Sequence, residues 1–223
     1  WGSIQTYYYN NRNNYCREEY ENKGLTVNWY EVDPKFLGMP WGLKGYWQRR
    51  LQKVVERWIG GNIEIEKSDI YGMRRYEDGA RLLMHVDRET THAVSLIVNV
   101  AQGGVRSPWN VEIYDHAYRL HEIEMQPGDI VYYESARCLH GRMAPLDGGY
   151  YVNFFTHYRP IGDPQWYKRP NPEGTPEPII NITGLEVPTL SKYNHVAKSE
   201  NDLFDFWKMV GAQRKLNTAR SDL

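Results

Sequence analysis

From Asn62 to Tyr158 the chain is a succession of short segments that are either apolar throughout or alternate between apolar and polar residues. Turn signals rich in Gly, Pro and Asp separate the segments, at residues 77–79, 103–104, 126–129 and 147–149. The segments read IEIE, DIYGMRRY, RLLMHV, HAVSLIVNV, NVEIYD, RLHEIEM, DIVYYES and YYVNFFTHY. Eight strands at this spacing predict a mainly β (α+β) fold, a jelly roll or double-stranded β-helix. The strands do not alternate with helices, which argues against a parallel α/β sheet.

Helical periodicity is confined to the flanks of this region. Residues 43–59 carry apolar side chains at three- and four-residue steps and are followed by Gly60-Gly61, which predicts a helix that braces a sheet. A second helix is expected at 199–215. Residues 1–30 are rich in Tyr and Asn and are expected to be irregular, with an edge strand. The 223 residues suit one domain. It would comprise an aromatic segment and bracing helix (1–61), a β-helix core (62–159) and a C-terminal arm and helix (160–223).

Net charge, apolar runs and cysteine content limit the classes of protein to which this chain could belong. The formal net charge is −1, which argues against a protein that grips nucleic acid through a broad basic surface. No apolar run is long enough to span a membrane, and the first residues carry no secretory signal pattern, so a cytoplasmic and a secretory location both stay open. The two cysteines, Cys16 and Cys138, are far apart in the sequence and are expected to be free thiols.

A histidine and an aspartate lie two residues apart on one predicted strand. Side chains two apart on a strand share a face, so His85 and Asp87 should project into the same space. His140 follows the apolar segment DIVYYES, 53 residues after Asp87, and can return to the same barrel mouth. Two histidines and a carboxylate form a facial triad that leaves positions open on Fe(II). A His-x-Asp pair alone would more often be a buried hydrogen-bonded pair, but the three residues together favour a metal site.

Two stretches resemble a known family. RYEDGARLLMHVD is similar to the iron-binding strand of the prolyl 4-hydroxylase-like branch of the Fe(II)/2-oxoglutarate-dependent dioxygenase superfamily. MQPGDIVYYESARCLHGRMAPLDGGYYVNFFTHYRP resembles the segment of that family that carries the distal histidine. The resemblance covers roughly residues 68–159. It implies that His85, Asp87 and His140 are both the iron ligands and the catalytic centre, and that Tyr76 donates a hydrogen bond to 2-oxoglutarate.

One position departs from the family pattern. Members usually place Lys or Arg ten residues after the distal histidine, to pair with the far carboxylate of 2-oxoglutarate, and here that residue is Tyr150. Because a dianion buried without a cation would be unstable, another base should serve. Arg142 is the first candidate, since a guanidinium pairs bidentately with a carboxylate. Arg159 comes next, followed by Arg81 and Arg75, and Tyr150 itself stays a cofactor-binding candidate by its position.

The remaining polar candidates point less clearly to chemistry. His116 and His121 are expected on the surface of a hairpin, because a five-residue spacing shares a face on neither a helix nor a strand. His92 and His157 could approach the barrel mouth. Ser95 and Asn153 could line the pocket or form hydrogen bonds in the core.

The resemblance implies a hydroxylase that uses Fe(II), 2-oxoglutarate and O2, with ascorbate as an optional reductant. Its substrate would be a prolyl residue of a peptide or protein, or alternatively a free amino acid or other small metabolite. Two readings from other classes stay open: a metal-binding cupin-like module without redox turnover, and a peptide- or carbohydrate-binding β-sandwich in which the three residues meet by coincidence. A zinc hydrolase is disfavoured because no Glu is evidently placed as a general base.

Overall fold

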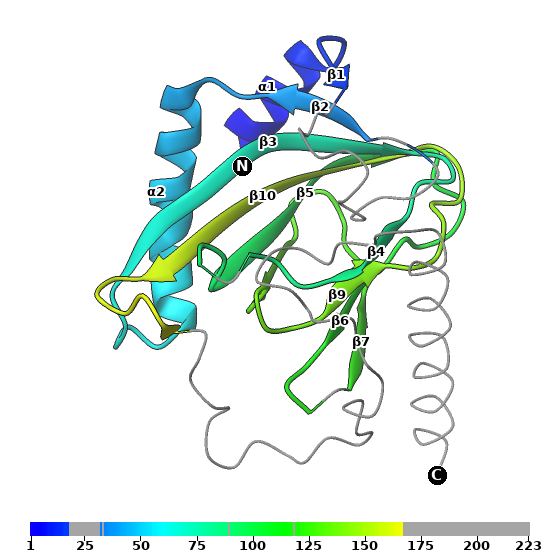
Figure 1. Ribbon diagram of the computed structural model, residues 1–223. Coiled ribbons are helices and arrows are strands. Elements are labelled where there is room, and N and C mark those ends of the chain that lie inside the picture. Colours follow the sequence, from blue (N-terminus) through cyan, green and yellow to red (C-terminus); the bar gives the residue numbers. More distant parts are fainter. Residues whose placement is uncertain (18–31, 33, 89, 118, 167–223) are drawn as a thin grey trace.

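The computed structural model describes residues 1–17, 32, 34–88, 90–117 and 119–166. Two helices and ten strands follow one another along this part of the chain (Figure 1). The order is α1 (Gly2–Asn11), β1 (Cys16–Arg17), β2 (Lys35–Gly38), α2 (Trp41–Trp58), β3 (Ile65–Glu77), β4 (Leu82–His85), β5 (Val94–Gly103), β6 (Val111–Tyr114), β7 (Leu120–Ile123), β8 (Ile130–Tyr133), β9 (His140–Arg142) and β10 (Tyr150–Pro160).

The strands form two sheets. The larger sheet has the order β1-β2-β3-β10-β5-β8, and the smaller has the order β4-β9-β6-β7. Every strand pair in the described residues is antiparallel. From β3 to β10 consecutive strands alternate between the two sheets, except that β6 and β7 both lie in the smaller sheet. This is the winding of a double-stranded β-helix. The fold predicted from the strand pattern is therefore confirmed.

The ends of the chain differ from expectation in part. Residues 2–11 form the helix α1 where irregular structure was predicted, while β1 is indeed an edge strand. The predicted segments IEIE and DIYGMRRY are covered largely by one long strand, β3. The helix predicted at 199–215 and the arm before it lie outside the described residues, apart from the arm's first positions. Within the described part of the chain, neither helix has the length and apolar character needed to cross a bilayer.

Helix α2 braces the outer face of the larger sheet, as predicted (Figure 1). Trp47 and Val55 are buried, and Trp47 meets Phe154 of β10 edge to face. The buried Gln48 side chain donates hydrogen bonds to the backbone carbonyls of Asp69 (3.0 Å) and His157 (3.4 Å). The helix is thus joined to the two strands, β3 and β10, at the point where their pairing becomes irregular.

The β3–β10 ladder loses its regular register between Phe154 and Tyr158. Around this irregularity the side chain of Tyr71 turns toward the space between the sheets, and Arg74 follows on the same side. Gly72 lies between them, where a Cβ atom would come within 2.6 Å of the Phe36 ring and the Leu37 carbonyl. Irregularities of this kind re-aim side chains near functional sites. Here the irregularity builds one wall of the cavity described below.

Candidate metal centre

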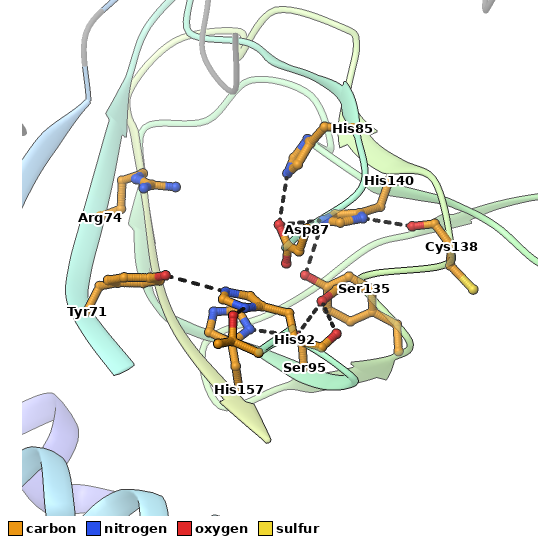
Figure 2. A network of polar contacts seen from close by, with 12 residues as sticks. Tyr71, Arg74, His85, Asp87, His92, Ser95, Ser135, Cys138, His140 and His157 are labelled. Carbon is orange, nitrogen blue, oxygen red and sulfur yellow. Dashed lines mark hydrogen bonds and ion pairs between the residues drawn. The ribbon is translucent and has the colours of Figure 1, made fainter. Parts of the chain in front are cut away.

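Three side chains converge from the smaller sheet and the segment that follows β4 (Figure 2). His85 ends β4 and lies directly opposite His140, the first residue of β9, and their ring centroids are 4.3 Å apart. The Asp87 amide donates to the Ser135 carbonyl, which fixes the chain just past the strand. Asp87 Oδ1 lies 3.5 Å from His85 Nε2 and 3.8 Å from His140 Nε2. The structure therefore brings the three predicted residues together.

Hydrogen bonds and burial prepare these side chains to bind a cation. His140 Nδ1 donates to the Cys138 carbonyl at 2.9 Å, which leaves the Nε2 lone pair toward Asp87. Burial, together with the nearby His85, lowers the pKa of His140 to about 4, so its ring is neutral at pH 7. Burial would raise the pKa of Asp87, but the hydrogen bond from His85 and the neighbouring histidines hold it well below its usual value. Two imidazoles and one carboxylate are a ligand set that a divalent ion can use.

A cavity of about 230 Å³ opens over the three residues. Phe36, Tyr71 and Arg74 form one side of it, and Ile97, Tyr133 and Phe155 form the apolar wall inside the barrel. The Tyr133 hydroxyl lies 3.4 Å from His140 Nε2, and burial followed by the charge of Asp87 raises its pKa well above the usual value. Tyr133 is therefore a protonated, neutral hydroxyl beside His140 Nε2.

His92 and His157 lie on the same cavity, below Asp87 in the view of Figure 2. Their ring centroids are 3.7 Å apart, and each can meet Asp87 with a ligand atom within 4.8 Å. His157 Nδ1 contacts Ser95 Oγ at 2.6 Å, and His92 Nδ1 contacts Thr91 Oγ1 at 2.5 Å. Burial lowers the pKa of both imidazoles. The approach of both histidines to the barrel mouth is thus observed.

A deeper layer of the barrel holds the two residues expected to contact 2-oxoglutarate. Tyr76 is fully buried and packs edge to face on Trp109 at 5.0 Å. Arg142 is buried two residues beyond His140, with its guanidinium 4.4 Å from the ring centroids of Trp109 and Tyr151. It donates to the Trp109 carbonyl. Among the described residues no carboxylate forms an ion pair with Arg142, and this buried cation does not reach the cavity wall.

The other cofactor-binding candidates lie elsewhere. Tyr150 packs on the helix side of the larger sheet beneath Arg75, and Arg159 pairs with Glu66 at 2.7 Å on the partly exposed end of β10. Neither borders the cavity. Alternation along β10 turns Tyr151, and not Tyr150, inward, and Arg159 lies at the far end of the strand, next to its last residue. Arg81 and Asn153 are not part of the cavity wall either. His116 and His121 pair with Glu134 and Asp115 outside it, as expected for surface histidines.

Arg74 and Tyr133 are among the cavity residues that were not singled out from the sequence. Arg74 lies over the Phe155 ring and donates to the Tyr76 hydroxyl at 3.5 Å. Strand alternation could have indicated it, because Arg74 and Tyr76 are two residues apart on β3. Tyr133 ends β8, seven residues before His140, and no local pattern marks it.

The two sheets and their winding define the chain as a double-stranded β-helix protein. Solved structures with a similar fold include a prolyl-4-hydroxylase from Pseudomonas putida, with 14% sequence identity and a TM-score of 0.50, over 71% of this chain and 86% of that one. A prolyl hydroxylase from Trichoplax adhaerens, in complex with a peptide fragment of the hypoxia inducible factor oxygen degradation domain, is similar over 70% of this chain and 78% of that one, at 15% identity and a TM-score of 0.50. At such identities the likeness shows the fold. No protein-family model and no curated protein sequence matches the chain.

Proposed function

We propose that this protein is an Fe(II)- and 2-oxoglutarate-dependent dioxygenase that hydroxylates an unactivated C–H bond. The observation that carries the proposal is the convergence of His85, Asp87 and His140 at the open mouth of a double-stranded β-helix. Two imidazoles and one carboxylate suit Fe(II) and leave further coordination positions for cosubstrate and oxygen. The likeness of the fold to two prolyl hydroxylases agrees with this assignment.

Arg142 and Tyr76, which lie in the layer behind the residues that line the cavity, are proposed to receive the far carboxylate of a 2-oxoglutarate that extends past the cavity wall. His140 and Arg142 are two residues apart on β9, so their side chains share a face and lie about 7 Å apart along the strand. That separation is comparable to the length of a five-carbon dicarboxylate. A buried guanidinium without a carboxylate partner is an unfavourable arrangement that a bound anion would relieve. The Tyr76 hydroxyl, already contacted by Arg74, adds a donor at the same depth.

The residues around the cavity support one overall reaction: a substrate C–H bond, O2 and 2-oxoglutarate give an alcohol, succinate and CO2. When bound, the iron supplies the activation of O2 with 2-oxoglutarate as the reductant. Ile97, Phe155 and Tyr133 keep water away from the inner wall of the cavity. Asp87 would occupy, on a bound iron, a coordination position that a halide would need, which favours hydroxylation over halogenation.

For the substrate we propose a prolyl residue in a peptide. Phe36 and Tyr71 lie on one side of the cavity and Phe155 lies on its inner wall, so a five-membered apolar ring would meet aromatic faces. Tyr71 is partly exposed, so a peptide could continue past it over the surface. A free amino acid or other small metabolite is the competing substrate class, and it would need no surface beyond the cavity.

The proposed function is tested by anaerobic titration of the metal-free protein with Fe(II) and 2-oxoglutarate. A metal-to-ligand charge-transfer band should appear in the wild type and in His121→Ala, because His121 pairs with Asp115 outside the cavity. The band should be absent in His85→Ala. Iron binding without the band in the wild type would contradict the dioxygenase and favour a non-redox metal module.

The substrate class is tested separately, with oxygen and the loaded protein. Proline-rich peptides and free proline are each incubated, and the gain of one oxygen atom is followed by mass spectrometry alongside succinate release. Hydroxylation of peptides alone supports the peptide reading. Hydroxylation of the free amino acid alone would contradict it while leaving the dioxygenase assignment intact.

A further inference from the structure

Beside the proposed iron site, two buried histidines face Asp87 from the larger sheet. His157 lies on β10 and His92 lies just before β5, so neither belongs to the strands that carry His85 and His140. The two imidazoles are 3.7 Å apart at their ring centroids, closer than His85 and His140. Figure 2 shows both groups of histidines around one carboxylate. The iron site does not account for this second pair.

The hydrogen bonds around His157 determine which of its nitrogens can bind a ligand. Ser135 Oγ donates its only proton to the His92 carbonyl at 3.2 Å. The 2.5 Å contact between Ser95 Oγ and Ser135 Oγ must then use the Ser95 proton. Ser95 Oγ is left to accept from His157 Nδ1, at 2.6 Å. His157 therefore carries its proton on Nδ1, and its Nε2 lone pair is available on the ring's other side.

His92 is oriented by its neighbours in a similar way. Its Nδ1 contacts the Thr91 hydroxyl at 2.5 Å, while its Nε2 has a longer, 3.4 Å contact with the Tyr71 hydroxyl. The Thr91 hydroxyl fixes the ring from one nitrogen and leaves the other only weakly engaged, as a carboxylate, carbonyl or water does beside metal-binding histidines. One ligand atom from each of Asp87, His92 and His157 lies within 4.8 Å of the others.

We propose that Asp87, His92 and His157 form a second divalent-metal site that shares Asp87 with the first. Because Asp87 Oδ1 faces His85 and His140, its Oδ2 is the oxygen for the second ion. Two imidazoles and one carboxylate oxygen suit Zn(II) and similar imidazole-preferring ions. Asp69 lines the same cavity. Its negative charge favours the positively charged form of His92, and it would favour a metal cation beside His92 in the same way.

A metal ion bound at this second site would inhibit the proposed dioxygenase. An ion held by His92 and His157 would lie within the space that the proposed function assigns to substrate, so it would exclude substrate without displacing the first ion. The inference rests on the proposed function only for this consequence. The site itself requires only that Asp87 be shared between two ions, as carboxylates are in two-metal centres with ions about 3.5–4 Å apart.

Equilibrium dialysis of the metal-free protein against Zn(II) alone tests the site, because it requires neither 2-oxoglutarate nor turnover. The wild type should bind two ions per chain, the second more weakly. His92→Gln/His157→Gln should bind one ion, and so should His85→Gln/His140→Gln. His116→Gln, whose partner Glu134 is outside the cavity, should still bind two. Circular dichroism checks that each variant is folded.

One ion per chain in the wild type would overturn the second site whatever the variants do. Two ions that survive in His92→Gln/His157→Gln would also overturn it, since they would lie elsewhere. Mn(II) provides an independent measurement on the wild type, because two ions sharing Asp87 should give a spin-coupled electron paramagnetic resonance signal, and two isolated signals would refute the bridge. Failure of the proposed function would show instead as two bound ions with no charge-transfer band on adding Fe(II) and 2-oxoglutarate.

Discussion

Replacement of Arg142 by Met separates a structural role of the buried guanidinium from a role in binding 2-oxoglutarate. Met fills a similar length of the barrel and removes the charge. Hydrogen bonds to charged groups contribute roughly 1.5–3 kcal/mol, and tenfold in affinity corresponds to about 1.4 kcal/mol. The dissociation constant of 2-oxoglutarate should therefore rise about ten- to hundredfold.

The same change should affect the stability of the free protein much less. It removes two cation–π contacts, worth about 2 kcal/mol each when desolvated, and it deprives the Trp109 carbonyl of its donor. These losses are offset by removal of a charge whose burial costs several kcal/mol. The net change in the free energy of unfolding should therefore be small, within about 2 kcal/mol.

Affinity is measured by anaerobic titration of the charge-transfer band, and stability by urea unfolding of the metal-free protein. Arg119→Met is the matched control, because Arg119 pairs with Asp115 at the surface and should leave both measurements unchanged. A 2-oxoglutarate affinity within twofold of the wild type in Arg142→Met would refute the reasoning. The anchor would then be sought at Arg74, which borders the cavity.

Three further predictions follow from other features. The metal-free protein should lose thermal stability as the pH falls from about 6.5 to 4, because His140 takes up a proton at its ordinary pKa when unfolded and only near 4 when folded. The loss should be smaller in His140→Ala. An equal loss in that variant would contradict the lowered pKa of His140. Gly72→Ala should destabilise the fold by about 1–3 kcal/mol in urea unfolding, since its Cβ would collide with the Phe36 ring and the Leu37 backbone; a neutral result would show that β2 moves freely. Only Cys16 should react rapidly with a thiol reagent at pH 8, because Cys138 is buried and burial raises its pKa to about 12; two fast thiols per chain would contradict this burial.

The strand pattern was sufficient for the fold because alternation and turn signals are local properties. It missed β9, which has only three residues, His140–Arg142, and no apolar alternation of its own. It also missed α1, whose residues GSIQTYYYNN bury only Ile4 and Tyr8 and carry no side-chain cap at the first turn. These elements exist because neighbouring strands and the core hold them, and such tertiary contacts leave no local signal.

The candidate metal centre likewise combines residues that a local pattern brings together with residues that only tertiary contacts bring together. His85 and Asp87 could be paired from the sequence because they are only two residues apart, although β4 ends at His85 and Asp87 lies just past the strand that was predicted to carry both. The contact between His157 and the Ser95 that orients it depends on the register of β10 against β5, where these residues lie directly opposite each other. Register between distant strands is set by packing, and a one-residue slip would turn His157 away from the cavity. For the same reason the spacing from the distal histidine could not say which face of β10 Tyr150 occupies, and the structure places it on the side of the larger sheet that faces the helices.

The link from Gln48 to the backbone of Asp69 and His157 makes helix α2 and the cavity parts of one cooperative unit. A ligand that holds His157 in place also holds its carbonyl, and through Gln48 it restrains the middle of the helix. Metal binding should therefore slow amide hydrogen exchange in α2, on the outer face of the sheet, and Gln48→Leu should weaken that protection. In this protein the helix that covers the barrel from outside would report on the occupancy of its interior.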